Sequence, residues 1–150
     1  MSEDSTGLEL VSFRMAEQDF CIDIMQVREI RGWTQSTALP QSPDFVCGVI
    51  NLRGTVLPVV DLSQRLGLGR TEPSARSAII VAHVGKKLFG LLVDAVSEIM
   101  SISEEAIQPT PDIGSDDVRS LLRGIVTIDN RMISVITLDN ILPDSVAAAA

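Results

Sequence analysis

The chain is poor in the residues from which most active sites are built. Its 150 residues include one histidine, two cysteines, one tryptophan and no tyrosine. A serine or cysteine nucleophile normally needs a histidine beside it, so such a site would have to use His83. We interpret His83, in the middle of an apolar stretch, as a surface or boundary residue. Motifs for nucleotide binding, zinc proteolysis and the hydrolase elbow are also missing from the sequence. We therefore predict no catalytic residues, no metal site and no cofactor.

Positive charge is scarce as well. Twelve Lys and Arg stand against twenty Asp and Glu, which gives a formal net charge of −8. Binding to a phosphate backbone needs a basic stripe, so we expect no nucleic-acid partner. No apolar run approaches the roughly 18–20 residues of a membrane helix, and the acidic segment 1–7 is unlike a signal peptide. The expected location is the cytoplasm, without direct membrane insertion.

The two cysteines, Cys21 and Cys47, lie in separate apolar stretches and lack CxxC spacing. We interpret both as buried thiols in a reducing compartment. An enzyme that used one of them as a nucleophile would need that thiol beside His83. Trp33 has two interpretations, a core residue or an exposed anchor for a partner.

The residues that are abundant, mainly Val, Ile and Leu, occur in short stretches bounded by turn residues. Alternation within 8–15 places Val11, Phe13 and Met15 on one inward face. Pro58 lies within another stretch and predicts an edge strand or a bulge there. Strands are predicted over 8–15, 20–24, 27–33, 46–52, 55–62, 77–84, 88–93, 95–102, 122–128 and 132–138.

These strands fall into two similar halves. The segment 20–30 aligns with 89–99 through matching Phe, Val, Glu and Ile residues, and 48–60 aligns with 124–136. The sequence therefore predicts two five-strand units, each closed into a small barrel to remove its edges. We expect one domain over 1–150, with sub-barrels over 8–68 and 77–143 joined by the linker 69–76. Each barrel alone is marginal in size, so the two should pack together and leave a groove between them.

Two charged residues occur where the pattern is otherwise apolar. Arg53 lies at a tight turn between two apolar strands, and Glu29 lies on a predicted strand with apolar neighbours. One interpretation is an ion pair that fixes the corner of a barrel. The other is that both residues line a groove for a partner protein, and the two interpretations are compatible.

Five segments together resemble the CheW family of chemotaxis coupling proteins. They are FCIDI (20–24), VREIRG (27–32), GVINLRG (48–54), LPVVDL (57–62) and VDAVSEI (93–99). The resemblance covers almost the whole chain, from Leu8 to Pro143. It implies an all-β fold of two intertwined five-stranded SH3-like barrels with short helical turns. It also implies a non-enzymatic adaptor that couples methyl-accepting chemoreceptors to the histidine kinase CheA in signalling arrays.

By motif position, the resemblance implies a receptor-binding groove at Val27, Glu29, Gly48, Arg53, Ala78 and Ile79. The partners implied are the cytoplasmic tip of the receptors and CheA, with the kinase at the ends of the barrels. An amphipathic helix pair is a chemically sensible occupant of a groove with apolar walls and a few charges. Two other functions stay open at this stage. One is a CheW-like scaffold in a parallel receptor–kinase pathway such as surface motility, and the other is a barrel that binds a small ligand.

Overall fold

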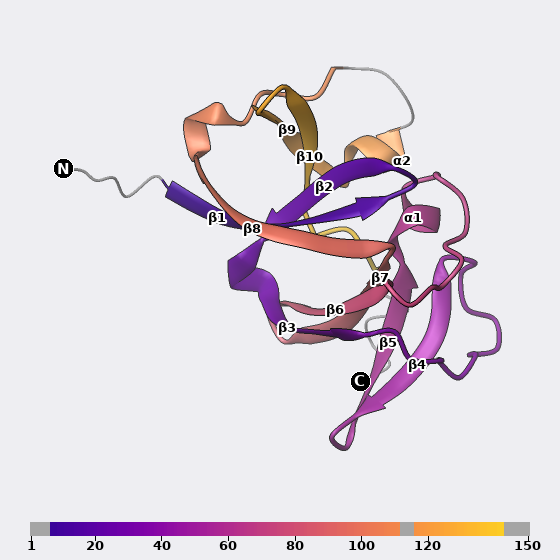
Figure 1. The fold of residues 1–150 in the computed structure, drawn as a ribbon. Helices are drawn as coiled ribbons and strands as arrows, with labels where there is room; N and C mark the ends of the chain where they lie inside the picture. The colour runs from indigo at the N-terminus through magenta and orange to yellow at the C-terminus, as the bar shows by residue number, and fades with distance from the viewer. Residues whose placement is uncertain (1–6, 112–115, 143–150) are drawn as a thin grey trace.

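A computed structural model describes residues 7–111 and 116–142, and within these residues ten strands form two five-stranded sheets (Figure 1). We name them sheet A and sheet B. The strand order in sheet A is β8 (Ala95–Ser103), β1 (Gly7–Met15), β2 (Gln18–Asp23), β10 (Arg131–Ile136) and β9 (Leu122–Ile128). The strand order in sheet B is β3 (Val27–Gly32), β6 (Ala78–Val84), β7 (Lys87–Val93), β5 (Thr55–Asp61) and β4 (Val46–Leu52).

Within residues 7–111 and 116–142, four short helices connect the strands. They are the 3₁₀ turns η1 (Ile24–Gln26) and η2 (Glu104–Ala106) and the single-turn helices α1 (Leu62–Arg65) and α2 (Asp116–Arg119). In the described part of the chain, none of the helices has the length and apolar character needed to cross a membrane. The all-β class predicted from the sequence is confirmed.

The predicted sequence repeat is present, but its two copies exchange strands. Strands β1 to β5 correspond to β6 to β10, with Phe20 in β2 matching Phe89 in β7 and Gly48 in β4 matching Gly124 in β9. The first two strands of each copy pair with the last three strands of the other copy. The predicted sub-barrels 8–68 and 77–143 therefore do not correspond to the two sheets. Because the copies are similar, a strand finds equivalent neighbours in either sheet, and the sequence pattern alone does not distinguish them.

The two sheets curl, but continuous strand pairing does not close them into barrels. In sheet B the edge strands β3 and β4 are linked through one isolated bridge, in which Thr37 and Val49 exchange hydrogen bonds of 2.9 and 2.8 Å. In sheet A the equivalent bridge joins Gln108 to Ile125 with the same two distances. In sheet B the segment that follows β3 thus pairs with β4. In sheet A the segment that follows β8 pairs with β9 in the same way.

Three apolar cores hold the sheets together. A large core lies between the sheets and contains Val11, Phe13 and Met15, as predicted, together with Ile80 and Leu91 of sheet B. Each sheet also encloses one smaller core within its own curl. Strand β1 is consequently buried on both faces, because its alternate residues, such as Leu10, fill the core of sheet A. The alternation in the sequence predicted one buried face and missed the second.

Pro58 does not mark an edge strand, because β5 lies between β7 and β4. The missing N–H is tolerated for a local reason. Strand β5 pairs with β7 only from Val59 to Asp61, whereas Pro58 faces β4 alone, opposite Val49. The part of β5 that contains Pro58 therefore has one neighbour, as an edge strand has.

The linker 69–76 is fixed to sheet B by a buried carboxylate. Asp61, at the end of β5, accepts hydrogen bonds from the backbone N–H of Thr71 at 2.8 Å and from its hydroxyl at 2.7 Å. Asp61 also accepts a bond from the Gln64 N–H at 3.3 Å, which caps α1. Both Asp61 and Thr71 are buried, so the linker is part of the packed fold.

Candidate protein-binding surface

The predicted ion pair between Glu29 and Arg53 is present and spans the two edges of sheet B. Glu29 lies on the edge strand β3 and Arg53 in the β4–β5 turn, and the Arg53 guanidinium donates a hydrogen bond to the Glu29 carboxylate. Arg53 holds this position with a positive φ of 52°, and the turn is closed by a 2.9 Å bond from the Gly54 N–H to the Asn51 side chain.

This hydrogen bond shifts the pKa values of both partners. It holds the pKa of Glu29 below its ordinary value, with further lowering by the charges of Arg53, Arg31 and Arg28. It also raises the pKa of Arg53. The pair is therefore fully charged at neutral pH, and any stability that it gives is lost only as the pH falls through the lowered pKa of Glu29.

Strand β3 presents different chemistry on its two faces. Residues that face each other on neighbouring strands point to the same side of a sheet. Ile30 lies opposite Ile80 and Val27 opposite Ala82, and both partners belong to the core between the sheets. Glu29 lies opposite Val81, which belongs to the core within sheet B. A register shift between Val27 and Glu29 separates the two sets, so Val27 and Ile30 face sheet A while Glu29 faces Arg53.

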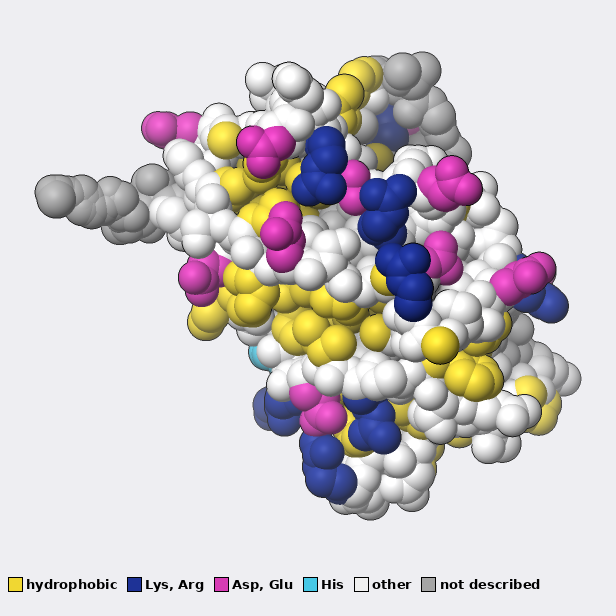
Figure 2. All heavy atoms as spheres, viewed as in Figure 1, with side chains coloured by type: hydrophobic (Ala, Val, Ile, Leu, Met, Phe, Trp, Pro, Cys, Tyr) yellow, Lys and Arg dark blue, Asp and Glu magenta, His cyan; other side chains and the backbone are white. Residues whose placement is uncertain are grey.

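The line where the two sheets meet, between the edge strands β3 and β8, carries an exposed apolar strip. Ile99 of β8 lies opposite Val11, a residue of the core between the sheets, so Ile99 points toward this line from sheet A. Ile30 is 43% exposed, Ile99 60% and Met25 of η1 77%. Figure 2 shows hydrophobic side chains gathered between these two strands. We call this the seam strip, and it consists of Met25, Val27, Ile30, Val96 and Ile99.

The predicted groove residues do not form one continuous surface. Val27 belongs to the seam strip, whereas Glu29 and Arg53 lie on the other face of β3. Ala78 and Ile79 of β6 are buried, Ile79 completely, so neither can line a groove as predicted. They lie behind β3, where Ala78 pairs with Gly32 and Ile79 with Arg31, because β6 is the inner neighbour of this edge strand.

Gly48 supports the surface from behind and does not line it. A side chain at Gly48 would overlap the backbone carbonyl of Thr37, in the bridge that joins the chain after β3 to β4. Gly124 meets the same constraint from the carbonyl of Gln108 in the equivalent bridge. The glycine is therefore needed for close approach of two backbone segments.

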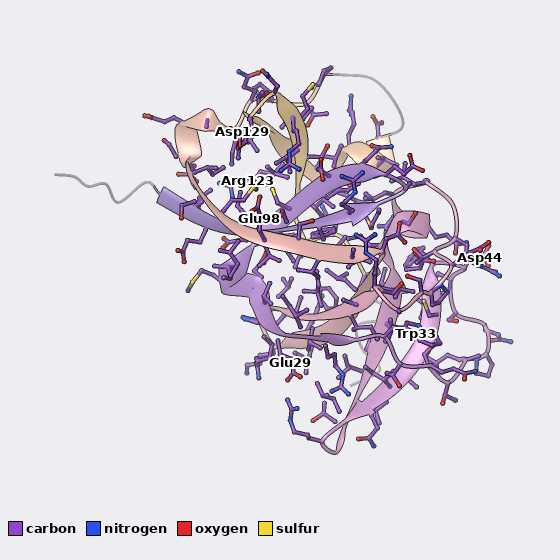
Figure 3. The ribbon with its side chains drawn as sticks, viewed as in Figure 1. Glu29, Trp33, Asp44, Glu98, Arg123 and Asp129 are labelled. Carbon is purple, nitrogen blue, oxygen red and sulfur yellow. The ribbon has the colours of Figure 1, made fainter. Side chains whose placement is uncertain are left out.

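A groove between the two units was predicted from the sequence, but of the residues in the seam strip only Val27 was assigned to it. Ile30 and Ile99 occupy matching positions in the two repeats, and both were identified only as markers of that repeat. Two exposed isoleucines at equivalent edge positions indicate a surface to which both copies contribute. The residues just before them, Glu29 on β3 and Glu98 on β8, also match in the repeat, and both are labelled in Figure 3.

The two thiols and Trp33 differ in how deeply they are buried. Cys21 is buried as predicted, in the core of sheet A, whereas Cys47 is only partly buried. Cys47 lines a cavity together with Trp33, which is 43% exposed and so is not a core residue. His83 lines a different cavity, beside the β6–β7 turn. The described structure therefore does not bring His83 and a thiol into one cleft.

Alkylation of the two thiols should proceed at different rates. Burial raises the pKa of Cys21 to about 12 and that of Cys47 to about 11, so few thiolates exist at neutral pH. We expect slow labelling of Cys47 in native buffer that accelerates as the pH rises, and no labelling of Cys21 until denaturant is added. Mass spectrometry of the alkylated peptides measures both rates. Rapid labelling of Cys21 in the folded protein would contradict its place in the core.

The comparisons with known proteins agree on one family. The family model of the CheW-like domain matches residues 9–146. A chemotaxis protein CheW of Rhizobium meliloti is 54% identical over 96% of this chain and 93% of its own length. A chemotaxis protein CheW of Thermotoga maritima is 35% identical over 91% of this chain and 88% of its own.

A solved structure shows the same fold. The crystal structure of the scaffolding protein TtCheW from Thermoanaerobacter tengcongensis aligns with a TM-score of 0.85 and 33% identity. The alignment covers 95% of this chain and 92% of that one. Sequence, family model and fold lead to the same conclusion, and the chain belongs to the CheW-like domain family.

Proposed function

We propose that this protein couples the cytoplasmic tip of methyl-accepting chemoreceptors to the histidine kinase CheA. The general class, a chemotaxis adaptor and scaffold, follows from the family and from the named relatives. In this proposal the protein binds and positions its partners, catalyses no reaction, and works in the cytoplasm at membrane-associated receptor arrays. The observation that carries the proposal is the seam strip.

The seam strip suits a helical partner. Its exposed side chains are aliphatic or thioether groups, and the strip follows two edge strands from different sheets. An amphipathic helix can lay its apolar face along such a strip and bury the isoleucines and methionine from water. At about 25 cal/mol per Å², burying a few such side chains contributes several kcal/mol to association. The receptor tip, as a pair of amphipathic helices, has the required chemistry.

The residues implied by the family resemblance act mainly by positioning β3. Glu29 and Arg53 tie this edge strand to the β4–β5 turn, and Gly48 lets the segment after β3 pack against β4. Ala78 and Ile79 support β3 from the buried side. In this account Val27 contacts the receptor directly, and the other five hold the strand that presents it.

The kinase is proposed to dock at the hairpin ends of the sheets. Val56 and Met132 occupy equivalent positions at the starts of β5 and β10, and both are more than half exposed. Because they lie outside the seam strip, one adaptor can bind receptor and kinase together.

The ion pair can be tested by reversing and then exchanging its charges. Arg53→Glu places a second carboxylate beside Glu29, and the repulsion should displace the β3 edge. We expect receptor binding to weaken by about tenfold, measured by isothermal titration with a receptor cytoplasmic fragment. The double variant Glu29→Arg with Arg53→Glu restores an attractive pair and should recover most of the affinity. A folded Arg53→Glu variant with unchanged affinity would show that the pair does not position the receptor site.

The proposed function itself is tested by reconstitution. Receptor fragment, kinase and this protein are mixed, and kinase autophosphorylation is measured with each component omitted in turn. We expect receptor control of the kinase only when all three are present. A protein that binds neither partner at micromolar concentrations would disprove the coupling function.

A further inference from the structure

The two repeats differ sharply in charge at one equivalent place, the end of each sheet at its first hairpin. In sheet A this place is the β1–β2 turn, and in sheet B it is the β6–β7 turn. The registers match closely. Arg14 pairs with Asp19 across the first hairpin, and His83 pairs with Leu88 across the second. The two turns can therefore be compared position by position.

In sheet A the positive charges are neutralised within the chain. Asp19 lies 3.2 Å from the Arg14 guanidinium and 3.9 Å from that of Arg131. Arg131 also lies 3.7 Å from the carboxylate of Glu98 on β8. Arg14 donates a further hydrogen bond of 2.9 Å to the carbonyl of Glu17. The cations at this end already have their acidic partners.

In sheet B two of the acidic residues at this end are replaced, whereas Glu98 has its equivalent in Glu29. Lys86 stands where sheet A has Glu17, and Leu88 stands where it has Asp19. A cavity at this end is lined by the basic or titratable residues Arg28, His83, Lys86 and Lys87 over the apolar side chains of Val56 and Leu88. None of the described lining residues is acidic, although the whole chain carries a net charge of −8.

Two of these cations, Arg28 and Lys86, are exposed, and Arg28 interacts with the Glu29 carboxylate only through its charge and not in an ion pair. Within the described residues, Arg28 and Lys86 form no ion pair or side-chain hydrogen bond, and both are exposed. Glu29, the nearby carboxylate on β3, is already bonded to Arg53. Burying an unpaired cation against a partner is costly, so a partner that covers this end has to supply negative charge.

The basic cavity begins where the seam strip ends. Arg28 follows Val27 directly on β3, and η1, which carries Met25, packs against β6, the strand that contains His83. A helix that lies along the strip therefore passes this cavity at one end.

From these observations we propose that the basic cavity, formed by Arg28, Lys86, Lys87 and His83, is an acceptor site for carboxylate side chains of the helical partner bound along the seam strip. This inference rests on the proposed function and adds the chemistry of the partner, which should present acidic residues beyond its apolar face. The apolar side chain of Leu88, which also lines the cavity, would receive the methylene groups of Glu side chains. The site would hold one end of a helix that lies along the seam strip.

The experiment measures binding of a receptor cytoplasmic fragment to Arg28→Glu, Lys86→Glu and the matched control Arg76→Glu. Arg76 is an exposed arginine of the linker and does not line the basic cavity. We expect each cavity variant to lose at least fivefold in affinity and to show a weaker salt dependence than the parent protein. The control should change less than twofold, and circular dichroism should show all three folded.

Contrary results are distinguishable. A parent protein that does not bind the receptor fragment overturns the proposed function and this inference with it. Receptor binding that is unchanged in both cavity variants, or lost equally in Arg76→Glu, overturns the acceptor site alone. The same holds if inorganic phosphate binds the parent protein at the cavity and receptor binding stays unaffected, since the cavity then takes a free anion.

Discussion

Placing aspartate at Ile30 and Ile99 together is expected to abolish receptor binding, with a loss of at least about 100-fold, or roughly 2.7 kcal/mol. Both side chains are exposed in the free protein, so the substitutions should cost little folding stability. In the complex, each carboxylate would be buried against an apolar helix face without a partner. Titration calorimetry with a receptor cytoplasmic fragment measures the loss.

The matched control is Met132→Asp, which introduces the same charge at an exposed apolar residue outside the seam strip. This variant should keep its affinity for the receptor and lose affinity for the kinase. If the double seam variant binds the receptor normally, the strip is not the receptor site. If Met132→Asp weakens receptor binding as strongly as the double variant, the loss of affinity comes from the added negative charge and not from its position in the seam strip.

The second large effect is expected on folding. Gly48→Ala should lower the free energy of unfolding by about 3 kcal/mol or more and the melting temperature by roughly 10 °C. Gly48 has a φ of 147°, which is unfavourable for an L residue, and its new methyl group would overlap the Thr37 carbonyl. The bridge between Thr37 and Val49 would have to open, which releases the segment that follows β3. Thermal unfolding monitored by circular dichroism measures the change.

Gly54 provides the control for this substitution. It also has a positive φ, of 92°, but its added methyl group would meet nothing within 4 Å. Gly54→Ala should therefore show backbone strain alone, about 1 kcal/mol. Equal effects at the two positions would mean that the close approach of Thr37 contributes nothing to stability.

Most of the secondary structure could be predicted from the sequence, because short apolar stretches bounded by turn residues determine strands locally. The repeat was also visible, since Phe20 and Phe89 or Glu29 and Glu98 occupy matching positions. The exchange of strands between the copies could not be derived from the residues. Strands β2 and β7 each continue through a short connection into the other sheet, and the apolar pattern is the same whether or not the chain crosses.

At the candidate site too, some features could be predicted from the sequence, whereas others depend on how the strands pair in the folded protein. The pairing of Glu29 with Arg53 was predictable, because two opposite charges in apolar surroundings need each other. The burial of Ile79 was not, because β6 becomes the inner neighbour of β3 only after the strand exchange. Conversely, Ile30 and Ile99 resemble core residues in the sequence. They are exposed because each lies on the outermost strand of its sheet.

The most direct test of the central claim is a nuclear magnetic resonance titration with methyl-labelled Ile, Met and Val residues. At 16.2 kDa the protein is well suited to this measurement. On addition of a receptor cytoplasmic fragment, we predict that the methyl signals of Met25, Val27, Ile30 and Ile99 shift or broaden, while that of Met132 stays in place. A shift of Met132, with the signals of the seam strip unchanged, would contradict the assignment of receptor binding to the line where the two sheets meet.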